Sequence, residues 1–293
     1  MSQSRYFVPT DPEGVQFHGA QTRWPLPEPD GSGGFRPGGP VDPPAGGSLV
    51  LHDLDGLLDD LGARIFEAEP APGGAGAARL VAETSWSIEA AARFALDCVD
   101  HIVGGSGELR LPNGASVSDL IEEAREFLQH GTAEKGALHA LSRLALARRL
   151  RRRGEEVADV AFGFALEDEA ADEDTFADPA WTAAAALREA LLSSVEAIRH
   201  RALPHLSEGE NVIYEEDQTT GGLAPEAIST PWGNFSGGGR RGVVPAWVAA
   251  QDAAERARQA MTDLAGEEAG KAERAYQRRL LAAALGLGEL SPA

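Results

Sequence analysis

The chain of 293 residues contains a single cysteine, Cys98. One thiol excludes an intramolecular disulfide and a cysteine-based zinc cluster, and it is typical of a reducing compartment. Residues 1–10 are mostly polar and lack the apolar segment of a secretory signal. No stretch approaches the roughly 18 consecutive apolar residues of a membrane-spanning helix. We therefore expect a cytoplasmic protein that does not insert into a membrane.

Lysine is almost as scarce as cysteine, since Lys135 and Lys271 are the only two. Arginine supplies the rest of the 26 basic side chains, and the heavy use of alanine and arginine suggests a GC-rich bacterial genome. The 46 acidic residues give a net charge of −20, which repels nucleic-acid phosphates and anionic lipid headgroups. Direct nucleic-acid binding is therefore disfavoured, and the expected partner is another protein.

Proline and glycine recur so often between residues 21 and 47 that neither a helix nor a continuous strand is expected there. We interpret residues 1–47 as a disordered Pro/Gly-rich arm. Large apolar side chains are few in this arm, and Trp24 is one of them. They either dock on the folded body or contact a partner.

The next segment carries the signature of a small β element. Residues 49–61 have leucines at helical spacing. Two short β-like runs follow, Ala63–Glu69 and Ala78–Thr84, joined by a loop rich in proline, glycine and alanine. These two runs predict a β-hairpin with a long loop.

Two amphipathic helices are predicted after the hairpin. The first begins at Ser87, a suitable N-cap, and carries an apolar stripe as far as Ile102, where a pair of glycines follows. The second is capped by Ser116 or Ser118 and closes at Gly131. Both have an apolar face that must be buried against other helices.

Two longer helices complete the predicted core. One spans about residues 133–171 and is broken or bent at Gly154. The other, the most regular of all, spans residues 181–201 and ends before Pro204. Helices of this kind, joined in sequence, predict a bundle.

We therefore predict a mainly α protein, with a core domain at residues 48–206. This core is a bundle of about four to five helices with a small β-hairpin, preceded by the disordered arm. Residues 207–245 are rich in glycine and proline and are expected to form a loop or linker. Residues 246–293 form a carboxy-terminal helical segment, which Gly266 and Gly270 are expected to divide.

The most specific candidate for chemistry is a pair on the helix that begins after Ser87. Asp97 and His101 are four residues apart, so they share one helix face and could hold a metal ion together. Cys98 is adjacent, but it points about 100° away around the helix. The competing interpretation leaves Asp97 solvated and His101 near the helix end, where the dipole favours a cation. Asp97 and His101 remain our candidate metal ligands, and no cofactor is predicted.

Other carboxylate patterns are weaker. Glu126 with His130 and Glu196 with His200 repeat the same spacing, whereas di-iron bundles use a Glu-x-x-His spacing that is one residue shorter. The Asp-Leu-Asp sequence at residues 53–55 resembles a magnesium-binding pair, but no βαβ series follows it. We expect these side chains to be structural or solvated.

An arginine-rich run at residues 148–153 includes Arg148, Arg149 and Arg152. It falls near a predicted helix end, where cations suit the dipole, and an acidic run begins at Glu167. Ion pairing within the protein or between subunits is the simpler interpretation. Binding to an anionic partner is the alternative.

The predicted linker contains a second basic group, Arg240 and Arg241, which follows three glycines. Such a sequence could cradle a phosphate with backbone amides, but it lacks the spacing and the lysine of a P-loop. A flexible linker is the simpler interpretation. Trp232 lies in the same segment. We take Trp24, Trp232 and the arginines Arg148, Arg149, Arg152, Arg240 and Arg241 as candidate partner-binding residues.

No nucleophile elbow and no convincing set of cysteine and histidine partners occurs in the sequence. We therefore expect a non-enzymatic interaction, adaptor or assembly protein of a bacterial cytoplasm. The alternative is a metal-dependent enzyme with a carboxylate and histidine site in the helical bundle.

Overall fold

The computed structural model describes eight stretches of the chain. They are residues 5–16, 21–44, 48–71, 76–106, 116–130, 137–167, 179–205 and 244–287. At residues 104–106, 137–138, 158–167 and 179–181 it describes the backbone alone. All statements below concern these stretches, and the predicted linker at residues 207–245 lies almost wholly outside them.

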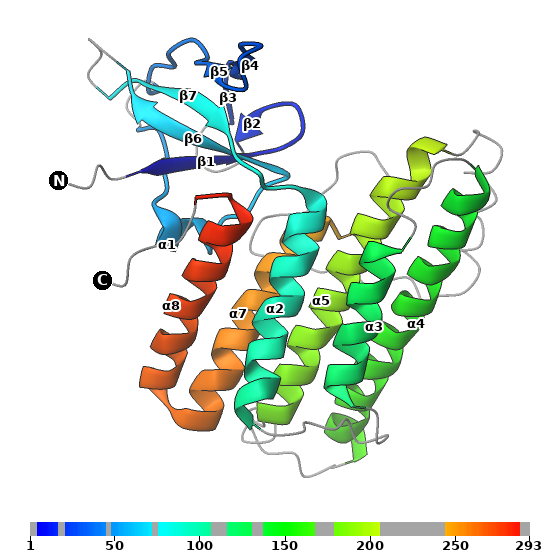
Figure 1. Cartoon of the computed structure of the whole chain (residues 1–293). Coiled ribbons are helices and arrows are strands. Elements are labelled where there is room, and N and C mark those ends of the chain that lie inside the picture. The colour runs from blue at the N-terminus through cyan, green and yellow to red at the C-terminus, as the bar shows by residue number, and fades with distance from the viewer. Residues whose placement is uncertain are drawn as a thin grey trace.

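Helices dominate the described chain, and six of them are long. In sequence order the helices are α1 (Leu54–Leu57), α2 (Ile88–Ser106), α3 (Val117–Gln129), α4 (Ala137–Glu167), α5 (Pro179–Ala202), α7 (Ala246–Ala265) and α8 (Glu267–Ala284). A 3₁₀ turn, Leu203–His205, follows α5. The long helices lie side by side, with a small sheet at one end of the bundle (Figure 1). None of the helices in the described stretches is long and apolar enough to cross a membrane.

The mainly α prediction is confirmed, but the bundle has more helices than the predicted four to five. The additional helices are α7 and α8, which come from the carboxy-terminal segment. α7 packs against α5 and α2, and α8 packs against α7 and α2. The carboxy-terminal segment therefore completes the bundle.

The disordered arm predicted for residues 1–47 is not confirmed, because the described parts of it fold onto the body. Strand β1 (Tyr6–Thr10) pairs antiparallel with β6 (Arg64–Pro70), which pairs with β7 (Ala78–Glu83). The strands β6 and β7 are the predicted hairpin, and all four of their ends agree with the prediction within one residue. Phe7 and Val8 are fully buried on opposite faces of the sheet, as the two-residue period of a strand requires.

Four short strands follow β1 in the sequence, and we call the strands β1 to β7 together the sheet module. They are β2 (Val15–Gln16), β3 (Thr22–Arg23), β4 (Glu28–Pro29) and β5 (Phe35–Arg36), paired β2 with β3 and β4 with β5. Trp24 is only 2% exposed and packs with Val8 and Phe66 in a second, smaller core beneath these strands. The prolines and glycines therefore lie in and around tight turns between two-residue strands. Strands this short give no alternating pattern in the sequence, so the sequence does not predict them.

Both edges of the three-stranded sheet are paired with other parts of the chain. On one side, Phe7 and His52 exchange backbone hydrogen bonds of 2.7 and 2.9 Å. On the other side, Val41 and Ala78 exchange bonds of 2.8 and 3.1 Å. Unpaired strand edges are templates for aggregation, so this pairing protects the hairpin.

The buried face of α7 consists of alanine. Seven alanines of α7 are buried: Ala246, Ala249, Ala250, Ala253, Ala254, Ala257 and Ala260. Their spacing forms a wide stripe that faces α2, α5 and α8. Small side chains allow neighbouring helix backbones to approach closely, so α7 can pack against three helices at once.

Several predicted helix boundaries need correction. Residues 49–61 form only one helical turn, α1, which Asp53 caps through its side chain. The backbone of α2 continues through the glycine pair to Ser106. Gly154 neither breaks nor bends the chain out of helical conformation, since α4 passes through it. Gly266 does divide α7 from α8, with a φ of +87° that favours glycine, whereas Gly270 lies inside α8.

These glycines give a paired test of packing. A Cβ built on Gly154 would lie 3.9 Å from the Cβ of Leu191, an ordinary contact. Gly154→Ala should therefore raise the free energy of unfolding by roughly 0.5 to 1 kcal/mol, because alanine restricts the unfolded chain. A Cβ on Gly270 would lie 2.1 Å from Oγ1 of Thr262, so Gly270→Ala should lower the free energy of unfolding by about 1 to 3 kcal/mol. Urea denaturation measures both, and equal effects of the two substitutions would contradict this packing.

Candidate functional site

The predicted metal pair lies in the second half of α2. This helix begins where the Ser87 hydroxyl accepts a bond of 3.1 Å from the Ala90 amide, which confirms the predicted cap. Its apolar side faces the main core, where Cys98, Val99 and Ile102 are fully buried. The polar side chains between them are therefore directed to the two margins of α2, toward α3 and toward α8.

Asp97 and Asp100 face α3. Arg125 of α3 donates to Oδ1 of Asp97 at 2.6 Å and to Oδ2 of Asp100 at 2.9 Å. The guanidinium group is about one-third exposed, so water screens both ion pairs. This bridge fixes α3 beside α2 but leaves both carboxylates within reach of solvent.

His101 faces α8 instead. Its Nδ1 lies 2.6 Å from Oε2 of Glu273, whose side chain has no solvent exposure. Because a carboxylate accepts hydrogen bonds, Nδ1 carries the hydrogen in this contact. Oε1 of Glu273 accepts a bond of 3.0 Å from Gln277, whose amide also donates to the Ala254 carbonyl of α7 at 2.8 Å. Three helices thus hold one buried carboxylate in place.

Tyr276 completes this group. Its ring stacks on the imidazole of His101, with 3.7 Å between centroids and 14° between planes. Partial burial, together with the nearby acids and thiol, raises the pKa of Tyr276, and full burial raises the pKa of the Cys98 thiol well above its usual value. We call His101, Glu273, Tyr276 and Gln277 the α2–α8 seam.

The structure gives the two predicted metal ligands different partners. Asp97 pairs with Arg125 of α3, and His101 pairs with Glu273 of α8. Among the described residues, no group of three or more His, Cys, Asp or Glu side chains is arranged to hold a metal ion. The metal assignment stays a prediction that rests on two side chains.

Sequence reasoning did not find Glu273, Tyr276 or Gln277. A weak signal was present, because Glu273 and Gln277 stand on the same stripe of α8 as Gly270 and Leu281, all of them buried. Polar residues at buried stripe positions indicate that a partner must satisfy them. Only the fold shows that this partner is His101.

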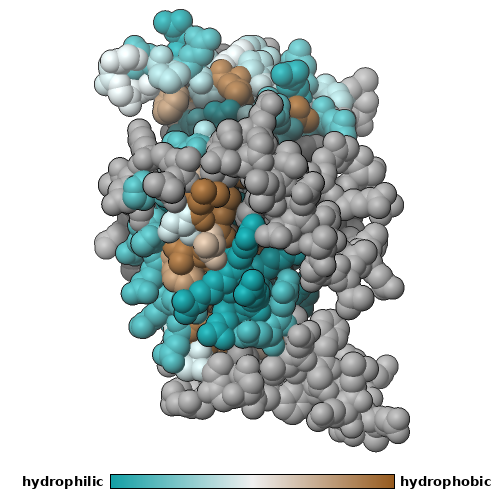
Figure 2. All heavy atoms as spheres, turned by 90° about the vertical axis from the view of Figure 1, so that its right-hand side faces the viewer, coloured by the Kyte–Doolittle hydropathy of each residue, from teal (hydrophilic) through white to brown (hydrophobic). Residues whose placement is uncertain are grey.

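The predicted arginine run lies on the outer part of α4. Arg149 contacts Glu123 of α3 at 2.5 Å and lies over the ring of Phe127, and Arg153 approaches Glu123 at 3.9 Å. Two more pairs are made within α4, Arg151 with Glu155 and Arg153 with Glu156. Figure 2 shows this side of the molecule, where a polar band lies below a group of apolar atoms.

The other predicted partner-binding residues divide into two groups. Trp24 donates from Nε1 to Oε1 of Gln16 at 3.2 Å inside the sheet module, so it offers almost no surface to a partner in this arrangement. Trp232, Arg240 and Arg241 lie outside the described residues. Their role stays a prediction.

The weaker carboxylate and histidine pairs do not converge with the seam. Glu126 and His130 are exposed at the end of α3. Glu196 is half-buried and pairs with Arg199 at 2.6 Å, and burial raises the pKa of Glu196. His200 is exposed. The two Glu/His pairs therefore belong to separate local surroundings.

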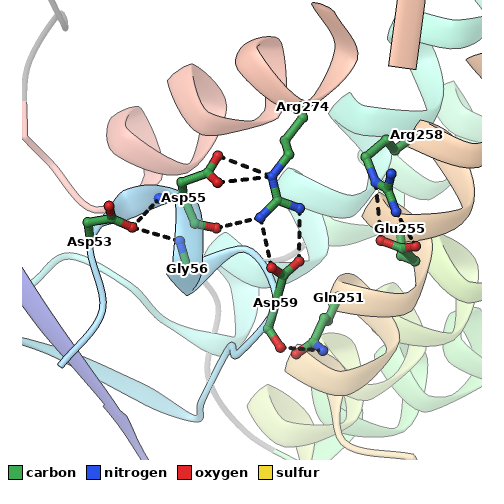
Figure 3. A network of polar contacts seen from close by, with 8 residues as sticks. All are labelled: Asp53, Asp55, Gly56, Asp59, Gln251, Glu255, Arg258 and Arg274. Carbon is green, nitrogen blue, oxygen red and sulfur yellow. Dashed lines mark hydrogen bonds and ion pairs between the residues drawn. The ribbon is translucent and has the colours of Figure 1, made fainter. Parts of the chain in front are cut away.

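The Asp-Leu-Asp sequence at residues 53–55 has a structural role. Asp53 accepts from the amides of Asp55 and Gly56 and so caps α1. Asp55 accepts from Nε of Arg274 at 3.1 Å, and Asp59 accepts two bonds from the same guanidinium at 2.7 and 2.9 Å (Figure 3). These bonds, from Asp59 first, raise the pKa of Arg274.

The same region ties α7 to the sheet module. Gln251 donates to the Asp59 carbonyl at 2.9 Å (Figure 3). It also accepts from the Leu61 amide at 3.1 Å. Ser85, at the start of the connection to α2, donates to the carbonyl of Ala284 at the end of α8 at 2.8 Å. The carboxy-terminal helices are therefore fastened to the sheet module by several polar contacts.

The chain was compared with protein-family models, with curated proteins and with solved structures, and none of the three comparisons found a match.

The contact of Arg274 with Asp55 and Asp59, which we call the Arg274 clasp, gives a testable coupling. Because one guanidinium contacts two carboxylates, the interaction of Arg274 with Asp59 should exceed a typical surface pair. A double-mutant cycle with Arg274→Met and Asp59→Asn should give a coupling of about 1 kcal/mol in the free energy of unfolding. The control is the pair Lys271 and Glu268 on the same helix, which is far more exposed. Equal coupling in the two cycles would show that the clasp has no special role.

A buried carboxylate of α5 gives a test of pH dependence. Burial raises the pKa of Glu189 above 4.5, although Arg188 at 2.5 Å opposes that shift. Between pH 4.5 and the raised value the folded state binds more protons than the unfolded state, so stability falls as the pH rises through that window. Glu189→Gln should remove this loss. Urea denaturation at several pH values should show the variant gaining stability over the wild type as the pH rises, and parallel curves would refute the assignment.

Proposed function

We propose that this protein is a non-enzymatic interaction or assembly protein of a bacterial cytoplasm, and that it binds a protein partner through the outer face of α4. The observation that carries this proposal is the exposure of Leu141. Its side chain is 43% exposed on α4, in line with the exposed Ala145 one helical turn later. Contiguous exposed apolar side chains, here one leucine and one alanine, are a surface that a protein partner can cover.

The position of α4 supports this choice. It packs against α5 and α3 and lies at the margin of the bundle (Figure 1). Its outer stripe continues from Leu141 and Ala145 to Arg148 and Arg152, at spacings of four, three and four residues. A partner helix could lie along such a stripe.

The charges of this face favour a protein over a nucleic acid. The arginines Arg149, Arg151 and Arg153 already have glutamate partners at or below 3.2 Å. A nucleic-acid site needs basic side chains that are available to phosphates. With much of the local positive charge paired, arginine methylenes and leucine are the surface that remains for a partner.

The amino-terminal segment is a less suitable place for the partner. It supplies β1 and Trp24 to the fold, so its removal would expose the edge of β6 and empty the second core. A truncation there would test folding rather than binding. Point substitutions on α4 are the sharper experiment.

The test compares two leucines with nearly equal exposure. Leu141→Glu on α4 should weaken partner binding by about 2 kcal/mol, roughly 30-fold, if the leucine is a central contact. Leu264→Glu, at the end of α7, is the matched control because Leu264 is 45% exposed. Affinity capture from the native cells with quantitative mass spectrometry should show proteins lost with Leu141→Glu and retained with Leu264→Glu. Identical sets of captured proteins for both variants and the wild type would exclude α4 as the binding face.

A metal-dependent enzyme is the second candidate, and one observation favours it. Glu273 orients His101 in the manner of a carboxylate behind a histidine ligand. An enzyme of this kind should purify with about one equivalent of a divalent metal. Asp97→Ala should reduce that content, and a metal content that is low and insensitive to Asp97→Ala would remove this candidate.

A further inference from the structure

We propose that His101 and Asp97 form a surface site for a borderline divalent cation such as Zn²⁺, and that Glu273 is the positioning residue behind it. This inference is independent of the proposed binding face on α4. It concerns only the margins of α2, and it applies equally to an interaction protein and to an enzyme.

The α2–α8 seam determines which nitrogen of His101 is available. Nδ1 points inward to the fully buried Glu273, and the side chain of His101 is 40% exposed. Nε2 lies on the other side of the imidazole ring and therefore faces outward with its lone pair. A histidine that ligates a metal almost always donates its second N–H to a carboxylate, carbonyl or water, which is the arrangement found here.

The ring is also held in one orientation. Tyr276 stacks on one face of the imidazole at 3.7 Å, and Gln277 fixes Glu273 through a bond to the backbone of α7. A ligand that is already oriented loses less conformational entropy when it binds. The fold therefore orients His101 before a cation binds, and little further conformational entropy of this side chain is lost on binding.

Asp97 supplies the second ligand from one helical turn earlier. Its carboxylate is 41% exposed and pairs with Arg125, and an exposed pair of this kind is worth little free energy. The carboxylate of Glu273 contacts the imidazole at 2.6 Å, and Asp97 and Asp100 stand within four residues of His101 on the same helix, which favours a cation over an anion. Binding would exchange Arg125 for the metal at Asp97, with water in the remaining coordination positions.

The chain contains a matched control on α3. Glu126 and His130 have the same spacing of four residues and are both exposed. Among the described residues, no buried carboxylate is hydrogen-bonded to His130 as Glu273 is to His101. Any preference for His101 over His130 therefore reports the contribution of the seam.

The experiment is a Zn²⁺ titration of the full chain, followed by the ¹⁵N resonances of its seven histidines. Nε2 of His101 should shift at lower Zn²⁺ concentration than either nitrogen of His130. His101→Asn should abolish that binding, and Glu273→Gln should weaken it by about 10- to 100-fold. Arg125→Gln should tighten it by roughly two- to fivefold, because Asp97 is then free of its competing ion pair.

Three results would overturn the proposal: Zn²⁺ affinity that His101→Asn leaves unchanged, a first response at His130, or weaker binding in Arg125→Gln. His101 and Arg125 are partly exposed, so both variants should fold, and circular dichroism checks this. These two variants decide the outcome even where Glu273→Gln unfolds the protein. Capture experiments on α4 are unaffected by failure here, so the two proposals fail separately.

Discussion

Close packing of alanine along α7 is the constraint on which the rest of the structure depends. A buried methyl group removes little apolar area from water, so an alanine face stabilises a bundle only when the helix backbones come close together. The buried stripe of α7 meets α2, α5 and α8 in this way. Because Gly270 has no side chain, α8 also lies directly against Thr262 of α7. An alanine interface of this kind leaves little spare volume, so it fixes the spacing of the helices more strictly than a leucine core would.

Closely packed interfaces between helices also fix the polar side chains within them. Glu273 and Gln277 are buried between α2, α7 and α8, and Ser193 of α5 is buried with its hydroxyl bonded to the Ala246 carbonyl at 2.8 Å. Burying a carboxylate costs free energy that its hydrogen bonds only offset, so these contacts add little net stability. They fix orientation instead. The half-exposed imidazole of His101 has one orientation because everything behind it is packed and hydrogen-bonded.

The sequence predicted those elements in which the apolar period and the end signals agree. Ser87 and Ser116 cap helices as expected, and the hairpin has nearly the expected ends. Prediction failed where one residue type has two roles. The sequence predicts a break or bend at Gly154, although this residue faces Leu191 inside a helix. It also predicts disorder from the prolines of the amino-terminal segment, although they lie in and around turns. At the candidate site, Asp97 and His101 follow from local spacing, but Glu273 is 172 residues away from His101, and no local pattern connects them.

The two proposed surfaces lie on either side of α3, and this arrangement limits how they can influence each other. Arg125 of α3 pairs with Asp97 and Asp100 of α2, whereas Glu123 of α3 pairs with Arg149 of α4. Both sets of ion pairs are partly exposed, so water and salt screen them, and the loss of one pair changes the field at the other only slightly. Communication between the surfaces would instead require α3 to move as a unit. Its buried residues Leu120, Ile121, Ala124 and Leu128 pack in the main core, which opposes such a movement. Electrostatic contacts therefore position α3, but apolar packing keeps the metal-site margin and the partner-binding face independent.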